Sequence, residues 1–289
     1  MDPVHDAVLV AAGLGTRMFP VSASLPKEAL PLVDVPLLTH LVLEAKAAGI
    51  RRLHVVTSEH KSFQPLLEDR SYHHRHRPEM DAELFHATQG MEVLVHHQRE
   101  PKGVGDAIGC ALHAVDGPFL VMLGDNLLMD THAPVAEYRP SLASKALVEA
   151  HGQFGGAVVG LMEVGETEVQ QYGMVAMDGH RITAVVEKPE PKNSPSRWAL
   201  CGRYVFPAET GELLRRFSYE EHGDLQSIAL QHHWMGEGKL FGVRLTDTQW
   251  YDSGSPLLWL QAQVDHALRR SEYAQTLRTW LDDRLHHQR

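Results

Sequence analysis

Short apolar runs alternate with amphipathic stretches over the first 130 residues of the chain. The strands predicted from these runs are 7–11, 53–57, 92–96 and 119–123. Apolar residues recur at helical spacing over 37–48 and stop at Gly49, which suits the C-terminal cap of a helix. Residues 104–115 predict a second helix. Strands that alternate with helices are typical of a parallel sheet with crossover helices.

The second half of the chain is richer in strands. Its predicted elements are strands at 157–162, 172–177, 181–187 and 199–206 and helical pieces at 224–235 and 255–285. No internal repeat and no low-complexity linker marks a domain boundary. We therefore predict one α/β domain over residues 1–289, with a Rossmann-like, mixed and mostly parallel sheet flanked by helices. A C-terminal helical segment at 253–289 completes it.

Composition excludes several classes of protein. The chain has 43% hydrophobic and 22% charged residues, and its formal net charge of −10 offers no basic field for nucleic acid. Its two cysteines, Cys110 and Cys201, lie far apart without a C-x-x-C pair, so neither a disulfide framework nor a thiolate metal site is expected. No apolar run reaches the length of a membrane span and the first residues, M-D-P-V-H-D, carry no targeting signal. We expect a cytoplasmic protein that does not enter a membrane.

Histidines gather at 72–76, inside a polar stretch that covers 71–90. A metal site there is one interpretation. The other is a solvated helix–loop excursion in a chain that has 20 histidines, and we favour it because H-H-x-H on a loop fixes no tetrahedral geometry.

A glycine-rich turn at 13–15 follows the first apolar run, and Arg17 comes directly after it. Lys27 follows between two prolines. Backbone N–H groups of such a turn can line up on a phosphate chain, and the two cations can reach the same anion. Met18 stands where a dinucleotide-binding loop needs its third glycine, and no G-K-[ST] follows, so an oxidoreductase or a P-loop protein is a weaker interpretation.

The full wording of this region, A-A-G-L-G-T-R-M-F-P followed by P-K-E-A-L-P-L-V-D, resembles the signature of the nucleotide-sugar pyrophosphorylases. It is most similar to the bacterial enzymes that join UTP to glucose-1-phosphate. The resemblance implies the nucleotide-diphospho-sugar transferase fold, with a nucleotide-binding half at 1–130 and a sugar-binding half at 131–252. It also implies that the nucleotide contacts Ala12, Gly13 and Gly15.

A second element, Q-R-E-P-K-G-V-G-D-A at 98–107, resembles the part of the family that contacts uracil. The resemblance assigns the base to Gln98 and Gly103. A glutamine amide offers a donor and an acceptor that suit the edge of a pyrimidine, and glycine lets the backbone approach the ring closely.

Two carboxylates complete the expected metal site. Asp125 ends the apolar run F-L-V-M-L-G-D, and Asp252 lies in W-Y-D-S-G-S, and both match the family's magnesium ligands. Carboxylate oxygens suit Mg²⁺, which also binds substrate phosphates. The wording Gly124-Asp125-Asn126 is closer to the thymidylyltransferases than to the P-D-V of the uridylyltransferases.

The last signature is V-V-E-K-P at 185–189. By the resemblance Lys188 holds the sugar phosphate, Glu187 bonds sugar hydroxyls, and Gly173 in the preceding Y-G pair belongs to the same pocket. Lone Glu-Lys pairs are usually solvated strand ends, so this assignment depends on the order of all the motifs together.

The reaction that the resemblance implies is UTP plus a sugar-1-phosphate giving a UDP-sugar and pyrophosphate. A phosphate monoester is ionised at neutral pH, since its second pKa is about 6, so no general base is required. We expect Lys188 to orient the attacking phosphate, Arg17 to hold the leaving pyrophosphate and Lys27 the triphosphate, with Mg²⁺ on the two aspartates. Catalysis is then positioning and charge stabilisation.

Three alternatives stay open at this point. The first keeps the reaction but uses dTTP or a different sugar-1-phosphate. The second is a non-catalytic regulatory subunit on the same fold, although all five expected charged residues are present. The third concerns assembly, because the apolar residues of 255–285 suit either core packing or a homodimer or homotetramer.

Overall fold

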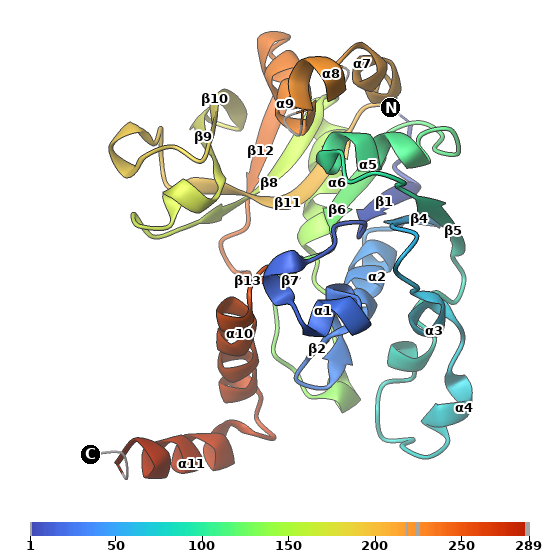
Figure 1. Cartoon of the computed structure of the whole chain (residues 1–289), viewed down its shortest axis with the longest axis vertical. Helices are drawn as coiled ribbons and strands as arrows, with labels where there is room; N and C mark the ends of the chain where they lie inside the picture. Colours follow the sequence, from blue (N-terminus) through green and yellow to red (C-terminus); the bar gives the residue numbers. More distant parts are fainter. Residues whose placement is uncertain (1, 218, 224–225, 287–289) are drawn as a thin grey trace.

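A computed structural model describes residues 2–217, 219–223 and 226–286. Its centre is a nine-stranded mixed sheet in the order β5-β4-β1-β6-β11-β8-β12-β10-β9 (Figure 1). The strands of this sheet are β1 Asp6–Val10, β4 Arg52–Thr57, β5 Glu92–His97, β6 Phe119–Leu123, β8 Ala157–Glu163, β9 Gly173–Asp178, β10 Arg181–Glu187, β11 Trp198–Phe206 and β12 Leu240–Arg244. The predicted mixed α/β sheet is confirmed.

The first half of the sheet is parallel. β1 pairs in parallel with β4 and with β6, and β4 pairs in parallel with β5. Ala7, Val8 and Leu9 have no exposed surface, as expected of a strand with both faces covered. All four strands agree with their predicted ranges to within a residue at each end. Beyond β6 the strands are mostly antiparallel, because β11 runs against both β6 and β8, whereas β8 and β12 are parallel.

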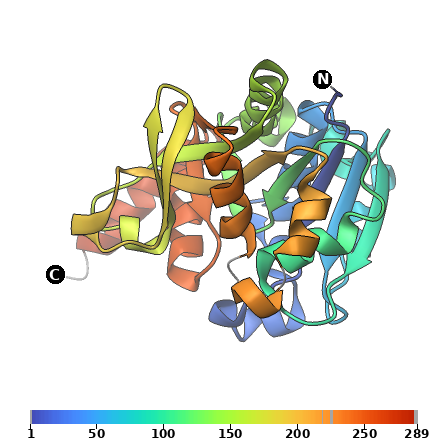
Figure 2. The ribbon, with the colours of Figure 1, turned by 90° about the horizontal axis from the view of Figure 1, so that it is seen from above.

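Helices cover both faces of the sheet (Figure 2). One face packs on α2 Leu37–Ala47 and α6 Ala143–Phe154, and the other on α5 Gly103–Ala111 and α9 Gln226–Gly236. α5 is shorter than the predicted 104–115, and α2 ends close to the predicted residue, where Gly49 has φ +87°. The remaining short helices are α1 Val21–Ser24, α3 Gln64–Leu67, α4 Ser71–His74, α7 Thr210–Arg216 and α8 Tyr219–His222.

Two small antiparallel pairs stand apart from the main sheet. β2 Pro31–Leu32 pairs with β3 Val35–Pro36, and β7 Asn126–Met129 pairs with β13 Gln249–Asp252. The second pair places Asp252 opposite Asn126, although the two residues come from distant parts of the chain. Periodicity predicts neither pair, because each strand is too short to carry a pattern.

The predicted helical segment 255–285 is two helices, α10 Pro256–Arg269 and α11 Ala274–His286. Ser255 caps α10 and Pro256 occupies its first turn. The chain leaves helical geometry at Arg270, which is 1% exposed and bonds both Asp34 and Glu272. α11 extends away from the sheet (Figure 1), and none of its residues is buried.

The histidine-rich stretch lies at the surface, where α4 contains only exposed or half-buried residues. Among the described residues, no three His, Cys, Asp or Glu side chains gather as a metal site. Within the same ranges, no helix is both long and apolar enough to span a membrane.

Candidate functional site

The loops that follow the four parallel strands meet at one edge of the sheet. They carry Gly13 after β1, Lys61 after β4, Gln98 after β5 and Asp125 after β6. Ligands of open α/β sheets bind outside the carboxyl ends of such strands. The edge is therefore where a site is expected.

Two adjoining pockets open there, with volumes of about 560 Å³ and about 280 Å³. They share Val104, Leu123 and Asp125 as a common wall. The smaller pocket contains, from the predicted site, Gly13, Lys27, Gln98, Gly103 and Asp125. The larger contains Arg17, Asp125, Gly173, Glu187, Lys188 and Asp252.

Two predicted residues do not line either pocket. Ala12 is buried at the end of β1. Gly15 has φ +66°, a left-handed conformation that glycine adopts freely, and a Cβ there would sit 3.4 Å from the Lys27 side chain. Its carbonyl accepts a 2.7 Å hydrogen bond from the Ser22 hydroxyl. Gly15 therefore shapes the loop in which Arg17 and Lys27 lie.

Lys27 lines the smaller pocket and contacts Asp125 in the wall that the two pockets share. It is 8% exposed and its Nζ is 2.5 Å from Asp125 Oδ2. Burial works to raise the pKa of Asp125, but the charge and hydrogen bond of Lys27, a backbone hydrogen bond and the charge of Arg17 together hold that pKa below its usual value. Asp125 therefore stays ionised in the wall that both pockets share.

A second buried ion pair lies beneath this one, and the sequence patterns do not reveal it. Lys61 Nζ bonds both Glu28 oxygens, at 3.0 and 3.2 Å, and donates to the Ala11 carbonyl at 2.9 Å. Glu28 follows Lys27 directly. Both Lys61 and Glu28 have side chains no more than 5% exposed. The pair ties the Lys27 segment to the end of β1.

The Gln98 amide is oriented by α5, the helix that follows it in the chain. Its Nε2 donates to the Gly103 carbonyl at 3.1 Å and to Asp106 at 2.7 Å. With both hydrogens engaged, the group that Gln98 offers to a ligand is its carbonyl oxygen. That oxygen is an acceptor for an N–H at a base edge.

The opposite side of the larger pocket is built from β9 and β10. A Cβ on Gly173 would come within 2.9 Å of a Glu187 carboxylate oxygen and within 2.9 Å of the Leu200 side chain, so a larger residue there requires both side-chain ends to shift. Lys188 has φ +45°, and its N–H donates to the Tyr172 carbonyl at 3.0 Å. Its ammonium is 3.5 Å from Glu187, and its side chain is 61% exposed.

Asp252 reaches the pocket from β13. Its Oδ1 accepts the Gly254 N–H at 2.7 Å, and a Cβ on Gly254 would lie 2.8 Å from both this oxygen and the Arg17 guanidinium. Burial raises the pKa of Asp252 above its usual value, and the Asp125 carboxylate raises it further. Two carboxylates that face one cavity and disfavour each other's charge suit a divalent cation that prefers oxygen ligands.

A protein-family model described as nucleotidyl transferase matches residues 6–267. The chain belongs to the nucleotidyl transferase family. It is 29% identical to a UTP–glucose-1-phosphate uridylyltransferase of Staphylococcus epidermidis, over 97% of this chain and 98% of that protein. It is 30% identical to the UTP–glucose-1-phosphate uridylyltransferase YngB of Bacillus subtilis, over 97% of this chain and 95% of that protein.

Solved structures place this nucleotidyl transferase in the same group. A UDP-glucose pyrophosphorylase from Acinetobacter baumannii superposes with a TM-score of 0.79 at 27% identity, covering 97% of this chain and 99% of that one. A UDP-glucose pyrophosphorylase complexed with UDP-glucose gives a TM-score of 0.77 at 26% identity, covering 91% and 98%. The predicted fold class is confirmed, and so is the family resemblance.

The larger pocket of this nucleotidyl transferase has aromatic side chains in its walls, which the sequence analysis does not assign to the site. Tyr172 and Trp250 lie with ring centroids 4.5 Å apart, and Tyr204 and Asn126 line the same space. Tyr172 and Trp250 are the first residues of the quoted Y-G and W-Y-D-S-G-S elements. Tyr172 directly precedes Gly173, and Trp250 lies two residues before Asp252, so their positions in the sequence could have identified them as site residues.

Proposed function

We propose that this nucleotidyl transferase makes UDP-glucose and pyrophosphate from UTP and glucose-1-phosphate. The observation that carries the proposal is the meeting of two pockets at Asp125, one with the residues expected for the nucleotide and one with those expected for the sugar. The relatives named for this activity, matched over nearly their whole length, support the same reaction.

In this proposal the half at 1–130 binds UTP and the half at 131–252 binds the sugar phosphate. The Gln98 carbonyl oxygen accepts the uracil N3–H, and the Gly103 backbone approaches the base. Gly13 and Gly15 shape the phosphate loop, and Lys27 and Arg17 face the triphosphate from one side.

The proposed reaction is an in-line displacement. An ionised oxygen of the sugar phosphate forms a bond to the α-phosphorus of UTP while the bond from that phosphorus to the pyrophosphate oxygen breaks. No proton needs to move. Lys188 orients the attacking phosphate, and the Glu187 carboxylate accepts hydrogen bonds from the hydroxyls of the sugar. Arg17 stabilises the charge that develops on the leaving pyrophosphate.

We propose Mg²⁺ as the metal and Asp125 and Asp252 as the residues that hold it. Two protein carboxylates with substrate phosphates and waters suit this ion, which is rarely held by a complete protein cage. Bound there, Mg²⁺ would supply positive charge to the crowded phosphate oxygens. The proximity of Lys27 to Asp125 keeps a second positive charge at the same place.

A second candidate keeps the chemistry and replaces UTP by dTTP. The Gly124-Asp125-Asn126 wording favours it. The Gln98 carbonyl does not separate the two nucleotides, because uracil and thymine carry the same N3–H. A regulatory subunit fits less well, because all five expected charged residues line the two pockets, namely Arg17, Lys27, Asp125, Lys188 and Asp252.

We also propose that the enzyme works in the cytoplasm, where its nucleotide substrate is held, and that it self-associates through its C-terminal helices. α11 has no buried residue, and Trp280 is 53% exposed. A helix of this length is marginally stable in water without a surface to cover it. A homodimer or homotetramer would provide one. Sedimentation at several concentrations tests this, and a monomer throughout would end the idea.

The test of the proposed function is pyrophosphate release from the purified protein with Mg²⁺ and glucose-1-phosphate, comparing UTP, dTTP, CTP, ATP and GTP. We expect UTP to give the fastest release. A clear preference for dTTP would transfer the proposal to the second candidate. No release with any nucleotide across a panel of sugar phosphates would overturn both and favour the regulatory subunit.

A further inference from the structure

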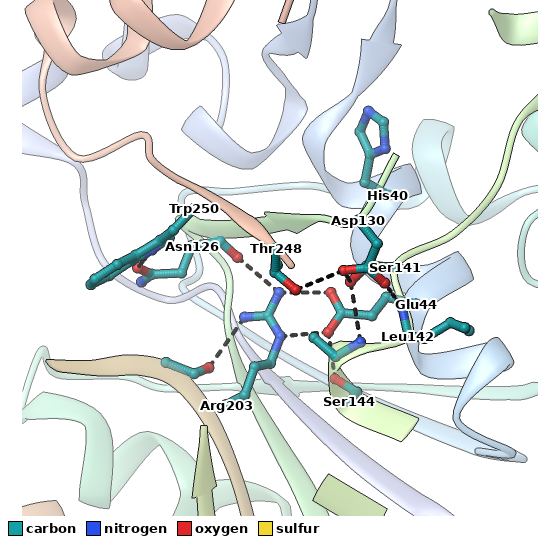
Figure 3. Close-up of polar contacts among 12 residues, drawn as sticks. His40, Glu44, Asn126, Asp130, Ser141, Leu142, Ser144, Arg203, Thr248 and Trp250 are labelled. Atoms are coloured by element: carbon teal, nitrogen blue, oxygen red, sulfur yellow. Dashed lines mark hydrogen bonds and ion pairs between the residues drawn. The ribbon is translucent and has the colours of Figure 1, made fainter. Parts of the chain in front are cut away.

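Besides its strand pairing opposite Asp252, Asn126 makes three hydrogen bonds, and Figure 3 labels two of the partners, Arg203 and Trp250. Its backbone carbonyl accepts from Arg203 at 2.9 Å. Its side-chain Oδ1 accepts the indole N–H of Trp250 at 2.8 Å, and its Nδ2 donates to Asp125 Oδ1 at 2.9 Å. An indole N–H is only a donor, so it fixes which end of the amide faces Trp250 and which faces Asp125.

The backbone of Asn126 is held from the core. Arg203 has no exposed surface and bonds both oxygens of Glu44, at 2.9 and 2.8 Å, as well as the Gly202 carbonyl at 3.2 Å. Ser144 adds a bond to the same carboxylate. The charges of this pair are thus compensated, and the Arg203 guanidinium donates to Glu44, Gly202 and Asn126, which holds the start of β7 in one place (Figure 3).

The two side-chain bonds point at different working parts of the site. Asp125 lies in the wall between the pockets, and Trp250 is a wall of the larger pocket with its ring against Tyr172. Trp250 and Asn126 lie on the paired strands β13 and β7. One small amide therefore connects the expected metal carboxylate to the aromatic wall of the sugar side.

We propose that Asn126 is a positioning residue that sets the Asp125 carboxylate and the Trp250 ring at the same time. It acts on turnover through Asp125 and on sugar-phosphate binding through Trp250. The inference rests on the proposed function, because it takes the larger pocket as the sugar site.

Three variants separate the two connections. Asn126→Asp keeps an acceptor for Trp250 and loses the donor to Asp125, and Trp250→Phe keeps a ring and loses the indole donor. Asn126→Leu loses both. We expect Asn126→Asp to lower kcat at least tenfold with little change in the KM for glucose-1-phosphate, because one hydrogen bond is replaced by two adjacent carboxylates. Trp250→Phe should raise that KM up to about tenfold and leave the KM for UTP unchanged.

Binding without turnover gives an independent reading. Calorimetric titration with UDP-glucose in the presence of EDTA measures binding of the nucleotide sugar to both pockets with no metal. Asn126→Leu and Trp250→Phe should each weaken this binding. A double variant that carries both substitutions should bind UDP-glucose no more weakly than Trp250→Phe alone. Thr248→Val is the matched control, because it removes the 2.9 Å bond from Thr248 to Asp130 in the same network without touching Asn126. Its constants should equal those of the unchanged enzyme.

Thermal unfolding of each variant shows that it is folded before it is assayed. If the loss of UDP-glucose affinity in the double variant equalled the product of the losses in the two single variants, the inference would be overturned and the proposed function would stay intact. Equal rises in both KM values for Asn126→Leu would also overturn it, since that is what loosening of the whole edge produces. If the unchanged enzyme neither releases pyrophosphate nor binds UDP-glucose, the proposed function fails, and the inference fails with it.

Discussion

The two sides of the site are built by different means. On the side that we propose for the nucleotide, Lys27 faces Asp125 and Lys61 faces Glu28, all within the loops at the edge of the parallel strands, and the lysines are almost completely buried. On the sugar side, the ammonium of Lys188 is largely in solvent, and its neighbour Glu187 is partly so. Buried ion pairs hold the side chains of the first side in place. On the second side, the backbone at the end of β10 positions Lys188.

The difference determines what a substitution would cost. Removing one partner of a buried ion pair leaves the other charge uncompensated, whereas an exposed pair contributes little to stability. The nucleotide side therefore couples stability to function. On the side that we propose for the sugar, we expect substitutions of the exposed side chains to leave the fold intact.

The largest effect is expected from Lys61→Met, which strands the Glu28 carboxylate. We expect a loss of about 3–5 kcal/mol in the free energy of unfolding, measured by urea denaturation. Lys46→Met is the matched control, because Lys46 bonds Glu83 at 3.0 Å at the surface, and it should cost less than about 1 kcal/mol.

Adding Glu28→Gln to Lys61→Met removes the stranded charge and should recover part of the loss. If Lys61→Met and Lys46→Met cost the same, the nucleotide side is not held by its buried charges, and the contrast between the two sides disappears.

The next effect is on rate alone. Lys188→Ala should reduce turnover by about 10²–10³, the usual cost of one lost contact to a developing charge, while the free energy of unfolding changes little. Calorimetry should find UTP binding retained and glucose-1-phosphate binding weakened. If Lys188→Ala bound the sugar phosphate normally and lost UTP binding, the roles proposed for Lys188 and Lys27 would have to be exchanged.

Most of the nucleotide side can be predicted from the sequence, because its residues follow strands that are easy to recognise. Gly13, Gln98 and Asp125 each come one to three residues after a strand that the apolar pattern predicts, and parallel strands bring their carboxyl ends to one edge. Lys61 also follows such a strand. It escapes prediction because a lysine in the polar stretch S-E-H-K-S shows no sign of its burial, which depends on Glu28 coming back beneath it.

The sugar side is less predictable for a physical reason. The bond between Asn126 and Trp250 depends on the register of β7 and β13, two four-residue strands that periodicity cannot pair. The break between α10 and α11 likewise depends on Arg270 finding Asp34 far away in the chain. The roles of the site residues remain predictions until variants are measured.

A smaller effect tests the close contact at the sugar side. Gly173→Ala places a Cβ against Glu187 and Leu200, and displacing Glu187 should raise the KM for glucose-1-phosphate by about tenfold to a hundredfold. The KM for UTP should not change. Gly152→Ala in α6 is the control, because a Cβ there meets nothing within 4 Å. An equal rise in both KM values for Gly173→Ala would mean that the two sides are not separate.

The smallest expected effect tests whether the backbone conformation orients the Lys188 side chain. At φ +45° a residue with a Cβ is in the left-handed region, which glycine enters at no steric cost. Lys188→Gly and Lys188→Ala both lose the ammonium, so their turnover should be equally low. In urea denaturation the glycine variant should be the more stable by about 0.5–1 kcal/mol, because the alanine variant keeps the strain. If the alanine variant were equally stable, the strand end would have relaxed without the lysine. The aim of Lys188 would then come from its own contact with Glu187 rather than from the backbone.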